Sequence, residues 1–140
     1  MKLLRFAAFF LVVACDVAAG GTAFAGDKDP LFVSLTTDDA YRVQLAFNLS
    51  KHMLERGHPL TIFFNDRGIL VASKANAEKF KDQQATLAEI AKAGATLLAC
   101  PYCMKHHGVK ESDLLDGIKV GNPQVTGDAL FRDNTKTLAW

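Results

Sequence analysis

The chain has 140 residues, of which 49% are hydrophobic and 22% are charged, and its formal net charge is +1. Removing an N-terminal targeting segment leaves about 115 residues, enough for one domain with a core and too few for two. The near-neutral charge, with no basic cluster interleaved with aromatic residues, argues against a nucleic-acid partner.

The first 25 residues are typical of an export signal. Lys2 and Arg5 give a positively charged start, the apolar stretch Phe6–Ala14 follows, and small residues precede the expected cut. We therefore expect a signal peptide at 1–25 and an exported, periplasmic domain at 26–140. This cut takes two of the 16 basic and one of the 15 acidic residues, which leaves 14 of each in a neutral domain.

A second interpretation of the N-terminus stays open. The residues Val12–Cys15 resemble the lipobox of bacterial lipoproteins, in which residues 1–14 are removed and Cys15 is lipidated. The protein would then be membrane-anchored through an Ala- and Gly-rich tether. No later apolar run reaches the roughly 18 residues that a membrane span needs, so we expect membrane contact only if Cys15 is lipidated.

The domain is predicted to begin with a strand at Leu31–Leu35. The polar stretch Thr36–Asp39 then caps a helix of about 17 residues that Gly57 ends. Apolar residues recur along this helix at helical spacing, so they form one side that is expected to face inward. The residues of this apolar side are Ala40, Val43, Ala46, Phe47, Leu49, Met53 and Leu54. A second strand is expected at Leu60–Phe64, with a turn at Asn65–Gly68.

The middle of the chain is less regular. We interpret Ile69–Ser73 as a loop folded over the site, with a short strand as the alternative, and Ala75–Lys81 as a helical turn. The pattern Thr86–Glu89 is typical of a capping box that opens a helix, and Gly94 is expected to end that helix. The inward side chains of this helix are expected to be Leu87, Ile90 and Ala91.

Short elements complete the chain. A buried strand is predicted at Thr96–Ala99, a short helix at Glu111–Asp116 and a brief strand at Gly117–Val120. A helix at Thr126–Asp133 and a last strand at Thr135–Trp140 follow. Strands that alternate with helices predict an α/β fold, a flavodoxin- or Rossmann-like parallel sheet of five strands with helices on both faces.

A flavodoxin-like order of these strands would create a crevice at one edge of the sheet. In the flavodoxin-like order the first and third strands part, and ligands bind outside their carboxyl ends. Cys100 follows the third strand. The residues that we expect to line the substrate crevice are Thr36, Thr37, Asp38, Asn65, Asp66 and Asn122. The alternative for Asp38 is a helix cap, and for Asn65 and Asp66 a structural turn.

A Cys-x-x-Cys pair, Cys100 and Cys103, lies where the third strand ends and a helix is expected to begin. Pro101 suits the first helical position, which has no hydrogen bond to lose. Unpaired N–H groups at a helix start favour a thiolate, so we expect Cys100 to be the nucleophile and Cys103 the resolving thiol. The pair can form a disulfide in an oxidising compartment, so the sequence does not decide whether its resting state is reduced or oxidised. The alternative is that both cysteines are unreactive and serve only as small buried hydrophobic residues.

Metal binding is the second interpretation of this segment. Cys100, Cys103, His106 and His107 are ligands that suit Cu(I). The second cysteine pair that is typical of structural zinc is missing. Our primary expectation is therefore thiol chemistry with no cofactor, and the alternative is a copper-binding module.

The mature chain resembles the DsrE/DsrF-like family, which includes the TusBCD-like sulfur-relay proteins. The resemblance spans Leu31–Trp140. The features that carry it are Thr36–Asp38 after the first strand, the turn Phe63–Gly68, Cys100 eight residues before Gly108, and the closing segment Asn134–Leu138.

This resemblance implies a parallel α/β fold, homo-oligomers such as trimers or hexamers, and transfer of persulfide sulfur between partners. The family's sulfur-accepting cysteine maps onto Cys100. The chain departs from the relay proteins in its export signal and in Cys103. We therefore expect a sulfur-donor or sulfur-acceptor protein, or a small sulfur species, as its partner. A non-catalytic assembly subunit is a further alternative.

Overall fold

The computed structural model describes residues 26 and 28–140, so the predicted signal peptide and Cys15 lie outside the described residues. In chain order the elements are β1 (Leu31–Leu35), α1 (Ala40–Glu55), β2 (Leu60–Phe64), the 3-10 helices η1 (Asp66–Leu70) and η2 (Lys74–Asn76), α2 (Lys81–Lys92), β3 (Thr96–Ala99), α3 (Pro101–His107), the 3-10 helix η3 (Glu111–Asp113), β4 (Ile118–Val120), α4 (Pro123–Leu130) and β5 (Lys136–Ala139).

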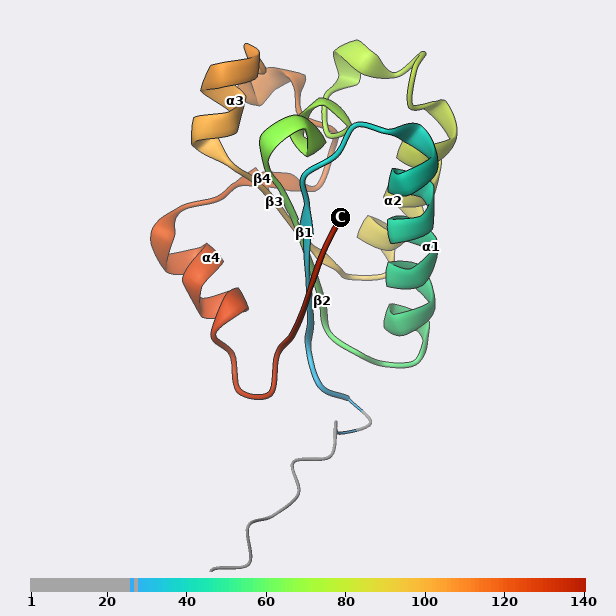
Figure 1. Cartoon of the computed structure of the whole chain (residues 1–140), viewed down its shortest axis with the longest axis vertical. Helices are drawn as coiled ribbons and strands as arrows, with labels where there is room; N and C mark the ends of the chain where they lie inside the picture. The colour runs from blue at the N-terminus through green and yellow to red at the C-terminus, as the bar shows by residue number, and fades with distance from the viewer. Residues whose placement is uncertain (1–25, 27) are drawn as a thin grey trace, which may run out of the picture.

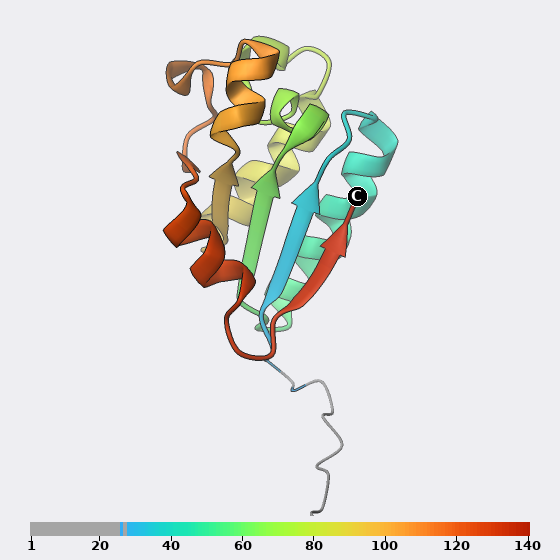
Figure 2. The same ribbon diagram turned by 60° about the vertical axis from the view of Figure 1, so that its left-hand side comes forward.

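The five strands form one parallel sheet in the order β4-β3-β2-β1-β5. Figure 2 shows β3, β2, β1 and β5 side by side with their arrowheads pointing the same way, and α3 above their carboxyl ends. Helices α1 and α2 lie on one side of the sheet and α4 on the other (Figure 1). The predicted α/β fold, a five-stranded parallel sheet with helices on both faces, is confirmed.

The strand order differs from the flavodoxin-like order that we expected. Strand β2 lies between β1 and β3, so these two strands do not part to form a crevice. The first three crossovers all step in the same direction across the sheet, and the chain reverses only between β4 and β5. The topological switch therefore lies between β1 and β5, and Thr36 rather than Cys100 follows a strand at that position.

The core lies between the sheet and the helices α1 and α2. Side chains alternate between the two faces of a strand, and Val33 and Phe64 point to this face, where both are fully buried. Phe47 of α1 packs edge-on against Phe64, with 6.4 Å between ring centroids. The predicted inward residues Leu87 and Ile90 of α2 are buried here as well.

Two helix starts differ from the prediction. Helix α2 begins at Lys81, so the capping-box interpretation of Thr86–Glu89 is wrong. The Thr86 hydroxyl lies within the helix and donates to the carbonyl of Asp82, and Glu89 pairs with Lys51 instead of capping. Helix α4 begins at Pro123 rather than Thr126 because the side chain of Asn122 caps it.

The segment Ile69–Ser73, which was expected to be a loop over the site, is packed into the core and overlaps only the end of a 3-10 helix. Element η1 covers Asp66–Leu70, and the side chains of Ile69, Val71 and Ala72 are fully buried. The segment therefore adds to the core, and the part of η1 that reaches the site is its first residue, Asp66. Within the described part of the chain, no helix has both the length and the apolar character that crossing a membrane requires.

Candidate thiol site

Cys100 lies at the junction of β3 and α3, where the sequence predicted it. Its extended backbone, with φ −71° and ψ 115°, makes it the N-cap residue of α3, and Pro101 occupies the first turn. The Cys100 N–H donates to the carbonyl of Phe64 at 2.9 Å, which ties the junction to β2. The sulfur is therefore held at the edge of the sheet where the parallel strands end.

The two thiols of the pair contact each other directly. Both cysteines are free and half-buried, and the Cys103 thiol donates to Sγ of Cys100 with 2.8 Å between the sulfurs. The backbone N–H of Cys103 also points to Sγ of Cys100, at 3.4 Å. Both hydrogen bonds stabilise negative charge on Cys100, because a charged acceptor gains more from them than a neutral one.

Cys103 is held in its protonated form. Burial is the largest cause that raises the pKa of its thiol to about 11, and the hydrogen bond to Cys100 adds to the rise. The backbone N–H of Asp66 opposes this by donating to Sγ of Cys103 at 3.1 Å. The Cys103 thiol is therefore a proton donor that faces Sγ of Cys100.

The position of Asp66 depends on the packing of η1 against β1. Asp66 has φ +44°, a left-handed conformation that is uncommon for residues with a side chain. The N–H of Asn65 donates to the carbonyl of Leu35 at 3.0 Å. A Cβ atom on Gly68 would lie 2.1 Å from that same carbonyl oxygen, so only glycine permits this close approach. The Asn65–Gly68 turn thus aims one N–H group at the resolving thiol.

Cys100 faces a small apolar cavity of about 180 Å³ between α3 and the start of α4. We call this space the apolar cavity. Its lining residues are Phe63, Cys100, Pro101, Tyr102, Gly121, Asn122, Pro123 and Thr126. Among these described residues, none carries a carboxylate, ammonium, guanidinium or imidazole group.

Cys103 faces a different space, which we call the polar cavity. Its volume is about 430 Å³, and its lining residues are Asn65, Asp66, Tyr102, Cys103, His106 and His107. The imidazole Nε2 of His107 lies 3.8 Å from the carboxylate of Asp66. Nε2 of His107 and the side-chain oxygen of Asn65 are buried without a hydrogen-bond partner. The first turn of α3 therefore separates two cavities, one for each sulfur.

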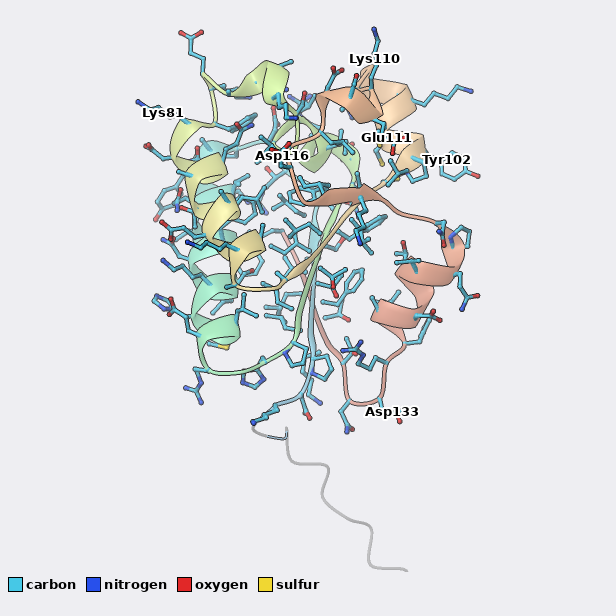
Figure 3. All side chains as sticks on the ribbon, turned by 180° about the vertical axis from the view of Figure 1, so that it is seen from behind. Lys81, Tyr102, Lys110, Glu111, Asp116 and Asp133 are labelled. Atoms are coloured by element: carbon cyan, nitrogen blue, oxygen red, sulfur yellow. The ribbon has the colours of Figure 1, made fainter. Side chains whose placement is uncertain are left out.

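Tyr102 belongs to both linings. Its side chain is 86% exposed, and Figure 3 shows it extending away from the ribbon at α3. Because it stands between the two cysteines in sequence, it forms the rim that the two cavities share. Three further lining residues, Phe63, Tyr102 and Thr126, were not expected from the sequence. The one available signal was the alternation along β2, which turns Phe63 away from the face of Phe64.

The structure separates the expected crevice residues into two groups. Asn122 lines the apolar cavity, and Asn65 and Asp66 line the polar cavity. Thr36 and Thr37 line neither. The Thr36 hydroxyl donates to the carbonyl of Trp140 at the end of β5, and the Thr37 hydroxyl accepts from the Asp39 N–H at 3.1 Å.

Asp38 also lies away from both cavities and forms an ion-pair network. Its carboxylate accepts two hydrogen bonds from Arg67, at 2.6 and 2.9 Å, and one from Lys79 at 2.9 Å. The hydrogen bonds from Arg67 and then Lys79 hold the pKa of this carboxyl well below its usual range. The helix cap that we gave as the alternative for Asp38 belongs to Asp39, which accepts from the Arg42 N–H.

The metal-binding alternative gains no support from the geometry. Nowhere in residues 26 and 28–140 do three or more His, Cys, Asp or Glu side chains gather in a way that could hold a metal ion. Cys100 lines one cavity, while Cys103, His106 and His107 line the other. Copper binding by these four residues stays a prediction.

Comparison with known proteins identifies the family and the fold. A family model described as "DsrE/DsrF-like family" matches residues 31–132. No curated protein matches the chain. Among solved structures, MTH1491 from Methanobacterium thermoautotrophicum, described as a protein of unknown function, aligns with TM-score 0.68 and 16% identity over 81% of this chain and 100% of its own.

Two further structures share the fold. BT1422 from Bacteroides thetaiotaomicron, described as a conserved protein of unknown function, aligns with TM-score 0.64 and 21% identity over 80% of this chain and 95% of its own. The YchN protein from E. coli aligns with TM-score 0.59 and 12% identity over 81% of this chain and 99% of its own. At these identities the likeness concerns the fold alone.

Proposed function

Because the chain belongs to the DsrE/DsrF-like family, we propose that it transfers sulfane sulfur or exchanges disulfides through Cys100, with Cys103 as the resolving thiol. One observation carries the proposal. The Cys103 thiol donates to Sγ of Cys100 over 2.8 Å, so the resolving sulfur already lies beside the sulfur that it would attack. A sulfur donor, a sulfur acceptor protein or a small sulfur species is the partner.

The first step is an attack by the Cys100 thiolate on the sulfane sulfur of a donor. A bond forms between Sγ and that sulfur, the donor's sulfur–sulfur bond breaks, and the donor leaves with the electron pair, as sulfite does when thiosulfate is the donor. The product is a persulfide on Cys100. The hydrogen bonds from the thiol and the N–H of Cys103 favour this step because they stabilise the thiolate before attack.

The second step has two outcomes. An acceptor thiolate that attacks the outer sulfur takes it away and restores the Cys100 thiolate. Without an acceptor, Cys103 loses its proton to water and attacks Sγ of Cys100, which releases hydrosulfide and forms the Cys100–Cys103 disulfide. An external dithiol must then reduce this disulfide. The raised pKa of Cys103 slows the second outcome, so the persulfide lasts longer than it would beside an ionised thiol.

Mass spectrometry tests the proposal. Reduced wild-type protein, Cys100→Ser and Cys103→Ser are treated with thiosulfate or inorganic polysulfide, and peptide mapping separates the thiol pair from Cys15. We expect one added sulfur on Cys100 in Cys103→Ser, and disulfide with released sulfide in wild type. Equal sulfur uptake by Cys100→Ser and wild type would contradict the role of Cys100.

We further propose that this chemistry takes place outside the cytoplasm, after cleavage of the signal at 1–25. The support is the charged start and apolar stretch of the sequence. Cell fractionation followed by mass spectrometry of the mature N-terminus tests this. A terminus at Gly26 indicates a periplasmic protein, a lipidated Cys15 indicates a membrane-anchored one, and an intact Met1 in the cytoplasmic fraction would contradict export.

We also propose that the chain forms homo-oligomers, as its family resemblance implies. All four residues of β5 are exposed, and α4 has no fully buried residue within the single chain. Edge strands with open hydrogen-bonding groups are common pairing surfaces. Light scattering of the purified protein tests this, and a monomer at all micromolar concentrations would contradict it.

A further inference from the structure

Apart from the first turn of α3 behind Cys100, the apolar cavity offers little that would bind an anion. None of its described lining residues carries a positive charge. The start of α4 offers few free donors, because the N–H groups of Val125 and Thr126 already donate to the side chain and the carbonyl of Asn122, at 2.9 and 3.0 Å. Pro123 has no N–H group. An anion here would exchange part of its hydration for apolar surface with no cationic side chain to compensate.

The lining and the volume of the apolar cavity instead suit a small uncharged ligand. Phe63, Pro101 and Pro123 offer hydrocarbon surface, and burying such surface against an apolar ligand is favourable. The volume of about 180 Å³ is below the roughly 300–1,000 Å³ of sites for drug-sized ligands. A ligand with only a few non-hydrogen atoms therefore fits.

The cavity also places its occupant against a sulfur nucleophile. Cys100 is the one residue of this lining that combines a thiol with hydrogen bonds that stabilise its charged form. Asp66, His106 and His107 line the separate polar cavity beyond the first turn of α3. An uncharged ligand with a sulfur–sulfur bond would thus meet the attacking atom without meeting these polar side chains.

We propose that the substrate attacked by Cys100 is a small uncharged dialkyl polysulfide, such as dimethyl trisulfide, bound in the apolar cavity, and that Cys100 reacts with it by thiol–disulfide exchange. This inference rests on the proposed function of Cys100. The Cys100 thiolate attacks a terminal sulfur of the trisulfide, the adjacent sulfur–sulfur bond breaks, and the methyl persulfide anion leaves with the electron pair and the sulfane sulfur. Cys103 then displaces methanethiolate from the Cys100 mixed disulfide and closes the Cys100–Cys103 disulfide.

The experiment compares an uncharged with an anionic substrate. The full-length protein carrying Cys103→Ser is used, because serine keeps an O–H donor near Cys100 but cannot resolve the adduct. Rates of Cys100 modification by dimethyl trisulfide and by thiosulfate are measured by mass spectrometry. Each rate is divided by the rate with N-acetylcysteine. We expect this normalised preference to favour the trisulfide by about tenfold or more, about 1.4 kcal/mol of selective binding.

Variants of the cavity wall extend the test. Thr126→Lys adds a positive charge and bulk to the wall, and we expect it to shift the preference toward thiosulfate by about tenfold, the low end of electrostatic effects in clefts. Gln124→Lys is the matched control on the same helix, because Gln124 is exposed and pairs with Asp128 outside the cavity. Thr126→Val preserves the shape, removes a hydroxyl group and should raise the trisulfide preference.

The outcomes separate this inference from the proposed function. A preference for thiosulfate in the parent protein overturns the inference but leaves Cys100 as a sulfur acceptor, as does an equal shift in Thr126→Lys and Gln124→Lys. Failure of both substrates to modify Cys100, while iodoacetamide does modify it, overturns the proposed function as well. If Thr126→Lys does not fold, the parent preference and Thr126→Val still decide.

Discussion

The backbone N–H of Asp66 donates to Sγ of Cys103 over 3.1 Å, from a residue whose φ is +44°. A left-handed backbone costs free energy for a residue with a side chain, and such residues cluster at functional sites. Here the left-handed conformation in the turn after β2 directs an N–H group at the resolving thiol and helps to hold it beside Cys100. The contact joins residues that lie 37 positions apart in the sequence.

The pH dependence of Cys103 alkylation is the first prediction. Burial and then the hydrogen bond to Cys100 raise the pKa of this thiol from 9.0 to about 11, so its reaction with iodoacetamide should stay slow at neutral pH and rise toward pH 11. Peptide mapping across pH gives the midpoint. Cys100→Ser should lower that midpoint without restoring 9.0, because burial remains. A wild-type midpoint at or below 9 would show that the thiol is not held protonated.

The same shift affects stability in the reduced protein. The folded state keeps the Cys103 proton more tightly than the unfolded state, so this contribution is fully present below the unfolded value near 9.0. It is lost as pH rises toward about 11. Urea unfolding of wild type and Cys103→Ala between these pH values should show the steeper loss in wild type, and parallel losses would contradict the assignment.

The Asp38 network is predicted to stabilise the loops that frame the site. Asp38→Asn removes the ion pairs with Arg67 and Lys79, and because the carboxylate is only 13% exposed we expect a loss of about 1–2 kcal/mol. Glu89→Gln is the control. It breaks a pair between side chains that are 39% and 61% exposed, and should cost clearly less than Asp38→Asn.

Acid pH distinguishes the two variants further. The folded-state pKa of Asp38 is lowered, so its contribution is complete above the ordinary value of 3.8 and is lost as pH falls below it. The stability difference between wild type and Asp38→Asn should therefore shrink below pH 4, as followed by urea unfolding. A difference that stays constant down to the acid-unfolding region would rule out the ion pairs as its cause.

The individual strands could be predicted from the sequence, but their order could not. Leu31–Leu35 and Leu60–Phe64 are short apolar runs between turn residues, and the structure has strands at these bounds. The order depends on the direction of each crossover, which apolar periodicity does not encode. Burial also overrides local signals. Phe80 is fully buried just before α2, and the helix starts beside it rather than at Thr86.

The site was predictable in part, since Asn65, Asp66 and Asn122 line the cavities as residues expected at the site while Thr36, Thr37 and Asp38 do not. The strand-to-helix junction at Cys100 follows from Pro101 and the preceding apolar run, and the structure has it. The polar cavity brings Asn65 and Asp66 to Cys103 from a distant turn, and no spacing in the sequence indicates that contact. The separation of the two sulfurs into two cavities depends on how α3 and α4 are placed, which is a property of the folded sheet.

Gly68 provides a test of the turn that holds Asp66. In Gly68→Ala the new Cβ would lie 2.1 Å from the carbonyl oxygen of Leu35, and because backbone cannot move aside cheaply we expect a loss of about 3 kcal/mol. Gly127→Ala is the matched control. Its Cβ meets nothing within 4 Å in helix α4, so it should gain about 0.5–1 kcal/mol. Urea unfolding measures both, and equal effects would contradict the close-approach argument.

Two buried serines give opposite predictions for the same substitution. The Ser50 hydroxyl is buried in α1 without a hydrogen-bond partner, so Ser50→Ala removes an uncompensated polar group and should stabilise the protein by about 1 kcal/mol. The Ser73 hydroxyl accepts from the Ala75 N–H at 3.3 Å and caps η2. Ser73→Ala should therefore destabilise by about 1 kcal/mol.

Urea denaturation with an unchanged m-value separates these effects from changes in the unfolded state. Both serines are at most 2% exposed, so burial does not distinguish them and only the hydrogen bond differs. If Ser50→Ala lost as much stability as Ser73→Ala, the Ser50 hydroxyl would have a hydrogen-bond partner in the folded protein, and the prediction would be wrong. If only Ser50→Ala increases the free energy of unfolding, the buried hydroxyl of Ser50 destabilises helix α1 in the wild-type protein.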